Sequence, residues 1–273
     1  MNIKSNFPLL YEKLQLLKMD LNHYKVVLFA KKNKALIPFK DKHKGKRCFI
    51  VATGPSLTAE DLNLIKDEIC FGVNSCVKAF DRTVWRPKYL CIMDGRMWPA
   101  IKDVVEAKSQ EIDTLFLGKD LNADCENVVK IERDQRPSTF LETQYFKRHT
   151  KILERCKFYI PLVQQMERYL CDGPTVVHST IELAIYMGFR EIYLLGTDCN
   201  YKGDIKHSSV ADYKMTTSIP DNVELKLFSC YRLIKKEIHN QSLDVNIYNS
   251  TRGGMLEVFE RRNLEDVVSN KYV

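Results

Sequence analysis

A short turn, Thr53-Gly54-Pro55-Ser56, has the residue types of an anion-binding loop. It follows an apolar run, residues 49–52, that predicts a buried strand, and it precedes residues 57–69, which predict a helix. Gly54 has no Cβ and lets a ligand approach the backbone, and Pro55 fixes φ near the value at which a helix begins. Backbone N–H groups at such a junction can bind phosphate, although many α/β proteins use the same turn only as a connection. Both interpretations stay open from this motif alone.

Polar residues also follow other predicted strands. Asn74, Asp94 and Asp198 each end an apolar run, and Asn249-Ser250 ends the last one. The carboxyl ends of parallel strands lie along one edge of an open sheet, where ligands bind. Turn formation alone requires only residues such as Gly, Ser and Pro, and not this set of Asn and Asp. Amide and carboxylate groups suit the hydroxyls and base edges of a nucleotide, so we predict a nucleotide cleft at this edge.

A second turn, residues 171–175, leads into a helix predicted over residues 176–187. Its Gly173 and Thr175 are therefore added to the candidate nucleotide-binding residues. Val177 and Ile181 lie on one face of that helix together with other small or apolar residues, which predicts that the helix is well buried.

These turns require a regular alternation of strands and helices to position them. The predicted strands are residues 49–52, 68–73, 89–93, 115–117, 191–195 and 245–248. The predicted helices are residues 57–69, 176–187 and 221–239, with Thr58 and Asp61 as a capping box in the first and Asp221 as the cap of the last. The alternation predicts an α/β fold with a Rossmann-like, mostly parallel sheet flanked by helices. Residues 119–172 lack a clean period and are assigned to a lid or inserted subdomain.

The N-terminal 44 residues are expected to form an extension, an amphipathic helix plus a basic linker, ahead of a catalytic domain over residues 45–273. Six large side chains recur at alternating steps of four and three: Leu10, Leu14, Leu17, Leu21, Tyr24 and Leu28. Residues 31–47 then hold eight Lys or Arg against one acid, Asp41. Three interpretations remain: a helix docked on its own domain before a solvated linker, an oligomerisation helix, or a membrane-surface element whose lysines meet anionic lipid.

Composition limits the class of protein. The chain has 273 residues, of which 45% are hydrophobic and 28% charged, as in an ordinary soluble domain. No apolar run reaches the ~18 residues that span a bilayer, and the N-terminus does not resemble a signal peptide. The nine cysteines form no CxxC pair, which predicts core residues in a reducing compartment. We therefore expect a cytoplasmic protein, with peripheral contact to the inner face of the membrane as the alternative, and no nucleic-acid partner, since the net charge of +7 comes with no aromatic-basic motif.

Five motifs carry a family resemblance: A-T-G-P-S-L, F-G-V-N-S, Y-L-C-I-M-D-G, E-I-Y-L-L-G-T-D-C-N-Y and I-Y-N-S-T-R-G-G-M-L-E-V-F. Over residues 46–268 the sequence resembles a bacterial domain family related to the archaeal 6-hydroxymethylpterin diphosphokinases. More distantly, it is similar to the bacterial sialyltransferases typified by the Campylobacter lipooligosaccharide enzymes. In those enzymes the matching motifs surround CMP-sialic acid, which the resemblance places here at residues 53–56, Asn74 and Asp198. Thr53 and Asp94 stand where the family pattern has Asn.

The resemblance to the sialyltransferases implies a metal-independent, inverting sugar transfer. A His deprotonates the acceptor hydroxyl, and tyrosines hydrogen-bond the departing phosphate. Such a base requires a pKa near the working pH. His207, in the loop after Asp198, is the candidate base by residue type and neighbourhood, and Tyr201 and Tyr213 are the candidates for the phosphate. His178 falls in the helix with the buried pattern and is expected to be structural.

Taken together, the residues and the resemblance predict a glycosyltransferase that uses a nucleotide-activated, CMP-linked sugar donor and a surface-glycan acceptor, without a cofactor. One alternative is a phosphoryl or pyrophosphoryl transferase of the pterin diphosphokinase type, with magnesium held by Asp94 and Asp198 at neighbouring strand ends. Another is a non-catalytic nucleotide-binding scaffold. A homo-oligomer is a further expectation that follows from the N-terminal helix.

Overall fold

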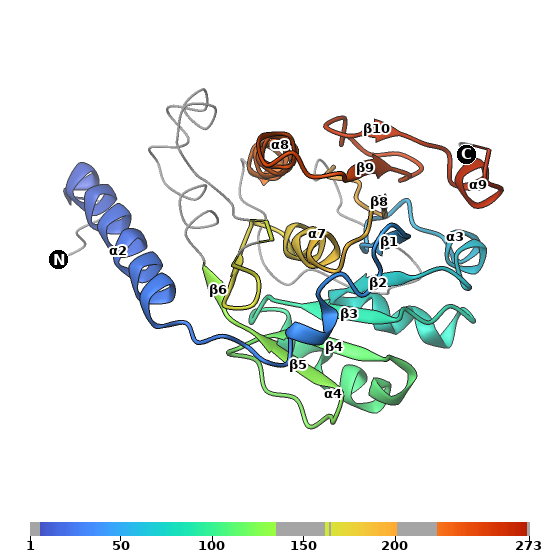
Figure 1. The fold of residues 1–273 in the computed structure, drawn as a ribbon, viewed down its shortest axis with the longest axis horizontal. Helices are drawn as coiled ribbons and strands as arrows, with labels where there is room; N and C mark the ends of the chain where they lie inside the picture. The colour runs from blue at the N-terminus through green and yellow to red at the C-terminus, as the bar shows by residue number, and fades with distance from the viewer. Residues whose placement is uncertain (1–5, 135–161, 164, 201–222, 272–273) are drawn as a thin grey trace.

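The computed structural model describes residues 6–134, 162–163, 165–200 and 223–271 (Figure 1). Its main feature is an eight-stranded sheet with the strand order β10-β9-β8-β1-β2-β3-β4-β5. Every strand pairing in this sheet is parallel. A further parallel pair, β6 and β7, stands apart from it. The predicted α/β fold with helices flanking a parallel sheet is confirmed.

The strands lie close to the predicted apolar runs. The main sheet contains β1 (Arg47–Val51), β2 (Cys70–Val73), β3 (Tyr89–Ile92), β4 (Thr114–Gly118), β5 (Val128–Ile131), β8 (Glu191–Leu195), β9 (Asn246–Asn249) and β10 (Glu260–Arg261). The separate pair contains β6 (Arg133–Asp134) and β7 (Leu170–Cys171). The sequence did not predict β5, β6, β7 or β10. β5 joins the main sheet beside β4, so at least this part of residues 119–172 belongs to the body of the domain, while residues 135–161 of the expected lid lie outside the described residues.

The helices differ more from the sequence prediction. They are α2 (Pro8–Phe29), α3 (Ala59–Leu64), α4 (Trp98–Ala107), α7 (Val176–Tyr186), α8 (Val223–Asn240) and α9 (Leu264–Val268), with the 3-10 turns η1 (Ile37–Phe39), η2 (Asn74–Asp81) and η3 (Ser109–Glu111). The capping box of Thr58 and Asp61 is confirmed, but α3 ends at Leu64 because the N–H of Ile65 bonds the carbonyl of Leu62 in a tighter turn. Asp221 lies outside the described residues. None of the described helices is both long and apolar enough to cross a membrane.

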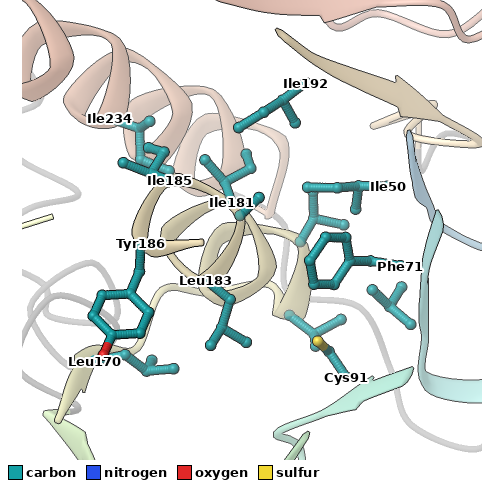
Figure 2. Packing of buried hydrophobic residues seen from close by; sticks show 14 of the residues in the cluster. Ile50, Phe71, Cys91, Leu170, Ile181, Leu183, Ile185, Tyr186, Ile192 and Ile234 are labelled. Carbon is teal, nitrogen blue, oxygen red and sulfur yellow. The ribbon is translucent and has the colours of Figure 1, made fainter. Parts of the chain in front are cut away.

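α7 is the centre of the core. Every residue of α7 is buried, because the helix lies between one face of the sheet and α8. Figure 2 shows Ile50 and Phe71 of the sheet on one side of α7 and Ile234 of α8 on another. The other face of the sheet is covered by α3, η2, α4 and α9. With both faces covered, the central strands are buried along almost their whole length, as parallel strands usually are. The described cysteines are free thiols, and all but the half-buried Cys125 are buried, as predicted.

The segment between α2 and β1 is packed into the domain, which differs from the solvated linker that the sequence suggested. Leu36 is 1% exposed, and the ring of Phe39 meets Phe116 edge to face at 5.1 Å. The His43 ring stacks on Phe189 at 4.8 Å. The lysines of this segment stay at the surface while residues between them reach the core, so the basic segment is packed against the domain.

Candidate functional site

β1 is the strand at which the order of the strands along the chain reverses. The chain runs from β1 through β2, β3, β4 and β5 on one side, whereas β8, β9 and β10 lie on the other. In open α/β sheets, ligands bind outside the carboxyl ends of the strands at such a switch point. The loop after β1 carries Gly54 and Ser56, and the loop after β8 carries Asp198. The residues predicted for the two loops therefore meet at the switch point.

Gly54 and Asp198 are in close contact. A Cβ on Gly54 would lie 2.0 Å from Oδ2 of Asp198 and 2.3 Å from the carbonyl oxygen of Gly196, so only glycine fits here. The N–H of Gly54 donates to that Gly196 carbonyl (2.8 Å). The Ser56 hydroxyl donates to Oδ2 of Asp198 (2.9 Å), and the Ser56 N–H donates to Oδ1 (3.3 Å). The turn therefore holds a carboxylate of the protein itself.

This contact bears on the predicted phosphate loop. The N–H groups of Gly54 and Ser56 already have partners, and the N–H of Thr58 is bonded to Asp61 in the capping box. The close approach of Asp198 and Gly196 explains why position 54 requires glycine, even without a ligand. Phosphate binding by this turn stays a prediction. Burial raises the pKa of the Asp198 carboxyl, while the two hydrogen bonds from Ser56 oppose the shift. Within the same turn, Thr53 is half-buried and Pro55 is exposed.

The loop after β9 covers Asp198 from the other side. The N–H of Met255 donates to the Asp198 carbonyl oxygen (2.7 Å), and a Cβ on Gly254, whose φ is +78°, would lie 2.3 Å from that oxygen. The Asn249 side chain holds the loop's shape: its amide donates to the Leu256 carbonyl (2.7 Å), and its oxygen accepts from the Thr251 N–H (3.0 Å). Asn249 is 1% exposed, and both ends of its amide form hydrogen bonds within the loop, so its side chain stabilises the loop conformation.

Asn74 and Ser250 differ from Asn249, because each has a polar atom for which the described residues provide no hydrogen-bond partner. The Asn74 Oδ1 and the Ser250 Oγ are buried. Within the described part of the chain, Oδ1 accepts no hydrogen bond, and Oγ neither accepts nor donates one. Asn74 is the first residue after β2, next to the switch point, and its φ of +49° is a left-handed conformation that Asn adopts more readily than most residues. A buried amide oxygen without a partner is costly, and a ligand that donates a hydrogen bond would relieve that cost.

Asp94 lies apart from Asp198, which corrects one sequence-based expectation. Two strands, β1 and β2, separate β8 from β3, so the two strand ends are about 14 Å apart at the usual strand spacing. They are not neighbours, and the two carboxylates cannot bind one metal ion between them. The Asp94 carboxylate instead accepts the Arg96 N–H (2.8 Å) and pairs with the Arg96 guanidinium (3.2 Å). Its side chain is 32% exposed and faces solvent beside the edge.

An arginine network that the sequence did not reveal lies beyond Asp94. The Arg133 guanidinium bonds Oδ2 of Asp172 (2.9 Å), Oδ1 of Asp120 (2.7 Å) and the carbonyl of Met93. Arg133 thus joins the ends of β3, β4, β6 and β7. Burial raises the pKa of the Asp172 carboxyl, and the Arg133 charge opposes that shift. The members of this network, Met93, Asp120, Arg133 and Asp172, come from four places in the chain, so no local motif marks them.

Gly173 and Thr175 both serve the start of α7. The Thr175 hydroxyl caps the helix by accepting the N–H of Val177 (3.3 Å). A Cβ on Gly173 would lie 2.6 Å from Cγ of His178, so glycine allows the close packing there. His178 is fully buried, as its place in the buried helix predicted, with Nδ1 3.2 Å from Oε1 of Glu182, and its structural role stays a prediction. A nucleotide contact by Gly173 or Thr175 stays a prediction.

The resemblance to the sialyltransferases implies three catalytic residues. His207, Tyr201 and Tyr213 lie outside the described residues. Within the described ranges no group of three or more His, Cys, Asp or Glu side chains is placed to hold a metal ion.

Comparison with known proteins adds a family and a fold. The family model of 6-hydroxymethylpterin diphosphokinase MptE-like proteins matches residues 19–204, so the match begins within α2 and ends earlier than the resemblance over residues 46–268 suggested. No curated protein matches the sequence. The solved MAf glycosyltransferase from Magnetospirillum magneticum AMB-1 is similar in fold, with a TM-score of 0.53 and 18% identity over 85% of this chain. The similar region is 37% of that glycosyltransferase, so this chain spans well under half of its length.

The likeness to the solved structure is one of fold, whereas the family match extends through the sequence of more than half of the chain. The match includes the turn after β1, the switch point and Asp198. On this ground the chain belongs to the 6-hydroxymethylpterin diphosphokinase MptE-like family.

Proposed function

We propose that the protein is a glycosyltransferase that moves a sugar from a nucleotide-activated donor onto a surface-glycan acceptor. The fold shared with a protein described as a glycosyltransferase supports this proposal. The observation that carries it is the buried Asn74 Oδ1 at the switch-point edge, for which the described residues supply no hydrogen-bond partner. An amide oxygen there is suited to accept from a ribose hydroxyl or from the amino group of a base.

The proposed donor is CMP-linked, as the resemblance to the sialyltransferases implies. The nucleotide would lie along residues 53–56, Asn74 and Asp198, with the partly exposed Asp94 available to a donor hydroxyl. This arrangement is supported by the position of β1, β2 and β8 side by side at the switch point. Ser250 follows β9, one strand further on, and its buried Oγ has no hydrogen-bond partner among the residues that the structure describes.

In the proposed reaction, the acceptor hydroxyl oxygen attacks the anomeric carbon of the donor. The bond from that carbon to the phosphate oxygen breaks with inversion, and CMP leaves. His207 takes the proton of the acceptor hydroxyl, and Tyr201 and Tyr213 donate hydrogen bonds to the phosphate. These three roles rest on the resemblance alone. General-base removal of a proton contributes about 10²–10⁴ in rate.

Pyrophosphoryl transfer from ATP is the second candidate, because the family takes its description from a 6-hydroxymethylpterin diphosphokinase. Such chemistry leans on a divalent metal to neutralise the phosphates. The separation of Asp94 from Asp198 removes the pair of metal ligands first proposed for it. A metal in this reaction would require other carboxylates.

The nucleotide site is tested with Asn74→Gly. Glycine accepts the φ of +49° and removes only the amide, so the fold should keep its melting temperature. Loss of one buried hydrogen bond should weaken nucleotide binding on the order of tenfold. The measurement is thermal shift of the whole chain with CMP, UDP, GDP and ATP, with and without magnesium, because a ligand that binds only the folded state raises the free energy of unfolding by RT ln(1 + [L]/Kd).

Ser242→Gly is the matched control, since Ser242 also has a positive φ, +50°, but lies at the end of α8. That variant should bind nucleotide as the wild type does. Unchanged nucleotide affinity in Asn74→Gly would contradict the proposed site.

The reaction class is tested by donor consumption with and without EDTA, for wild type and His207→Ala together. Glycosyl transfer should proceed in EDTA and slow by about 10²–10⁴ in His207→Ala. Strict magnesium dependence with an active His207→Ala enzyme would favour pyrophosphoryl transfer. Nucleotide binding without any turnover would support a non-catalytic scaffold.

A further inference from the structure

α2 carries a row of large apolar side chains on its surface. This leucine stripe consists of Leu10, Leu14, Leu17, Leu21, Tyr24 and Leu28. Each of the six is between 47% and 67% exposed. Phe7 and Phe29 extend the stripe at its two ends and are 49% and 75% exposed. A continuous exposed apolar row of this length usually marks a surface that binds a protein or a membrane.

The last turn of α2 is bonded to the domain on another side of the helix. Val26 and Val27 pack against the core, and the Arg168 guanidinium donates to the carbonyl oxygens of Val27 (2.8 Å) and Ala30 (3.0 Å). Just beyond the helix, Lys32 Nζ lies 2.6 Å from Oε2 of Glu167. Figure 1 shows α2 at the outer side of the molecule near β6. The leucine stripe therefore belongs to a helix attached to the domain.

Lysines flank the leucine stripe on both sides. At 3.6 residues per turn, Lys13 falls beside one border of the stripe, and Lys18 and Lys25 fall beside the other. All three side chains are exposed. An apolar face bordered by lysines is typical of helices that lie in the plane of a bilayer surface, where the lysine stems reach the headgroups.

The net positive charge of the chain lies in this helix and in the segments next to it. Residues 1–47 hold twelve Lys or Arg and three acids, a formal charge of +9, whereas the whole chain is +7, so residues 48–273 are at −2. An anionic surface would therefore attract the N-terminal region and slightly repel the rest of the molecule. Each lysine close to an anionic bilayer surface raises the binding constant about fivefold.

A second copy of α2 is less favoured by the same charges. With Leu14, Leu21 and Leu28 as core positions of a parallel coiled coil, Lys13 would face Lys18 of the second copy, which repels. Asp20 would face Lys25 of the second copy, which attracts. The two pairs offset each other, so the flanks give a dimer no net electrostatic gain.

We propose that α2 and the basic segment after it dock the protein on a bilayer surface that carries anionic lipid. The leucine stripe enters the boundary between headgroups and acyl chains, and the flanking lysines contact lipid phosphates. This inference does not depend on the proposed glycosyl transfer.

The test is co-sedimentation of the full chain with vesicles of phosphatidylcholine, alone or mixed with phosphatidylglycerol. We expect binding to the mixed vesicles only, weakening as salt is raised. The variant Leu14→Gln/Leu21→Gln/Leu28→Gln should bind at least about 10²-fold more weakly through lost apolar burial. The variant Lys13→Gln/Lys18→Gln/Lys25→Gln should lose on the order of 10²-fold.

Two matched controls should bind as the wild type does. Val84→Gln replaces an apolar side chain that is 70% exposed on the domain itself. Lys66→Gln/Lys119→Gln/Lys235→Gln removes three exposed lysines of the domain.

Three outcomes would overturn the proposal. One is equal binding to neutral and anionic vesicles, or none to either. Another is a dimer in light scattering that the leucine variant dissociates, without vesicle binding, which would assign the stripe to a coiled coil. The third is a large drop in the melting temperature of the leucine variant, which would show that the stripe is covered by the protein's own chain.

Discussion

Acid should destabilise the fold through His43. The Nε2 of His43 lies 2.7 Å from the Tyr89 hydroxyl, and its Nδ1 is buried without a hydrogen-bond partner among the described residues. A protonated ring would therefore place a charge and an unpaired donor in the core. Burial lowers the pKa of His43 from its ordinary 6.5 to about 4, and the charges of Lys42, Lys46 and Lys88 act in the same direction.

The size and sign of the effect follow from these two pKa values. The unfolded chain takes up the proton near pH 6.5, whereas the folded chain does so only near pH 4. Between these values the unfolded state binds more protons, so the free energy of unfolding falls as the pH falls. At 1.36 kcal/mol for each pKa unit, the loss approaches about 3 kcal/mol at pH 4. Well above pH 6.5, where His43 is neutral in both states, it adds no pH dependence.

Urea unfolding followed by tryptophan fluorescence measures this loss, because Trp85 and Trp98 are buried and should report unfolding. The comparison is between wild type and His43→Gln, from about pH 7 to about pH 4. The substitution changes the free energy of unfolding at every pH, so only the change of the difference with pH is informative. All other titrating groups are common to both proteins and cancel in that difference. The difference between the two free energies of unfolding should change by about 3 kcal/mol over this range. Parallel pH profiles for the two proteins would refute the reasoning.

Three further predictions concern the carboxyl edge. Gly54→Ala should lower the free energy of unfolding by about 1–3 kcal/mol or more, because the new Cβ would collide with Asp198; an unchanged urea midpoint would contradict the contact. Arg133→Met should cost about 3–5 kcal/mol by leaving Asp172 buried without its cation, and adding Asp172→Leu should recover much of the loss. A double variant no more stable than the single one would argue against the pair. Thr175→Ala should cost about 1 kcal/mol through the lost cap of α7, and the same variant tests the predicted nucleotide contact, which unchanged nucleotide affinity would contradict.

The fold could be predicted where a strand or helix has its own local pattern. β1, β2, β3, β4 and β8 are apolar runs because both sheet faces are covered, and such runs are visible in the sequence. β5 was missed because it is an edge strand with alternating burial, and β10 because it is two exposed residues long. α4 (Trp98–Ala107) was not predicted from the sequence.

Long-range contacts explain most of what the sequence could not reveal. Leu36, Phe39 and His43 lie among lysines, and only their partners in distant strands and after α7 show that they are core residues. A deletion of residues 1–44 would remove all three, so we expect it to destabilise the domain. The neighbourhood of Gly54 and Asp198 followed from the strand-end rule, but the separation of Asp94 from Asp198 depends on strand order, which no local pattern encodes.

The pairing of β1 has a consequence for how the chain is made. β1 pairs with β2, which follows within 20 residues, and with β8, which begins 140 residues after β1 ends. At about 5–20 residues per second of synthesis, one edge of β1 waits roughly 7–28 s for its partner. During that time an apolar strand presents unpaired N–H and C=O groups, the kind of edge that aggregates or recruits a chaperone. Asp198 arrives only after β8, so a nascent chain acquires its site at the moment when this edge is closed.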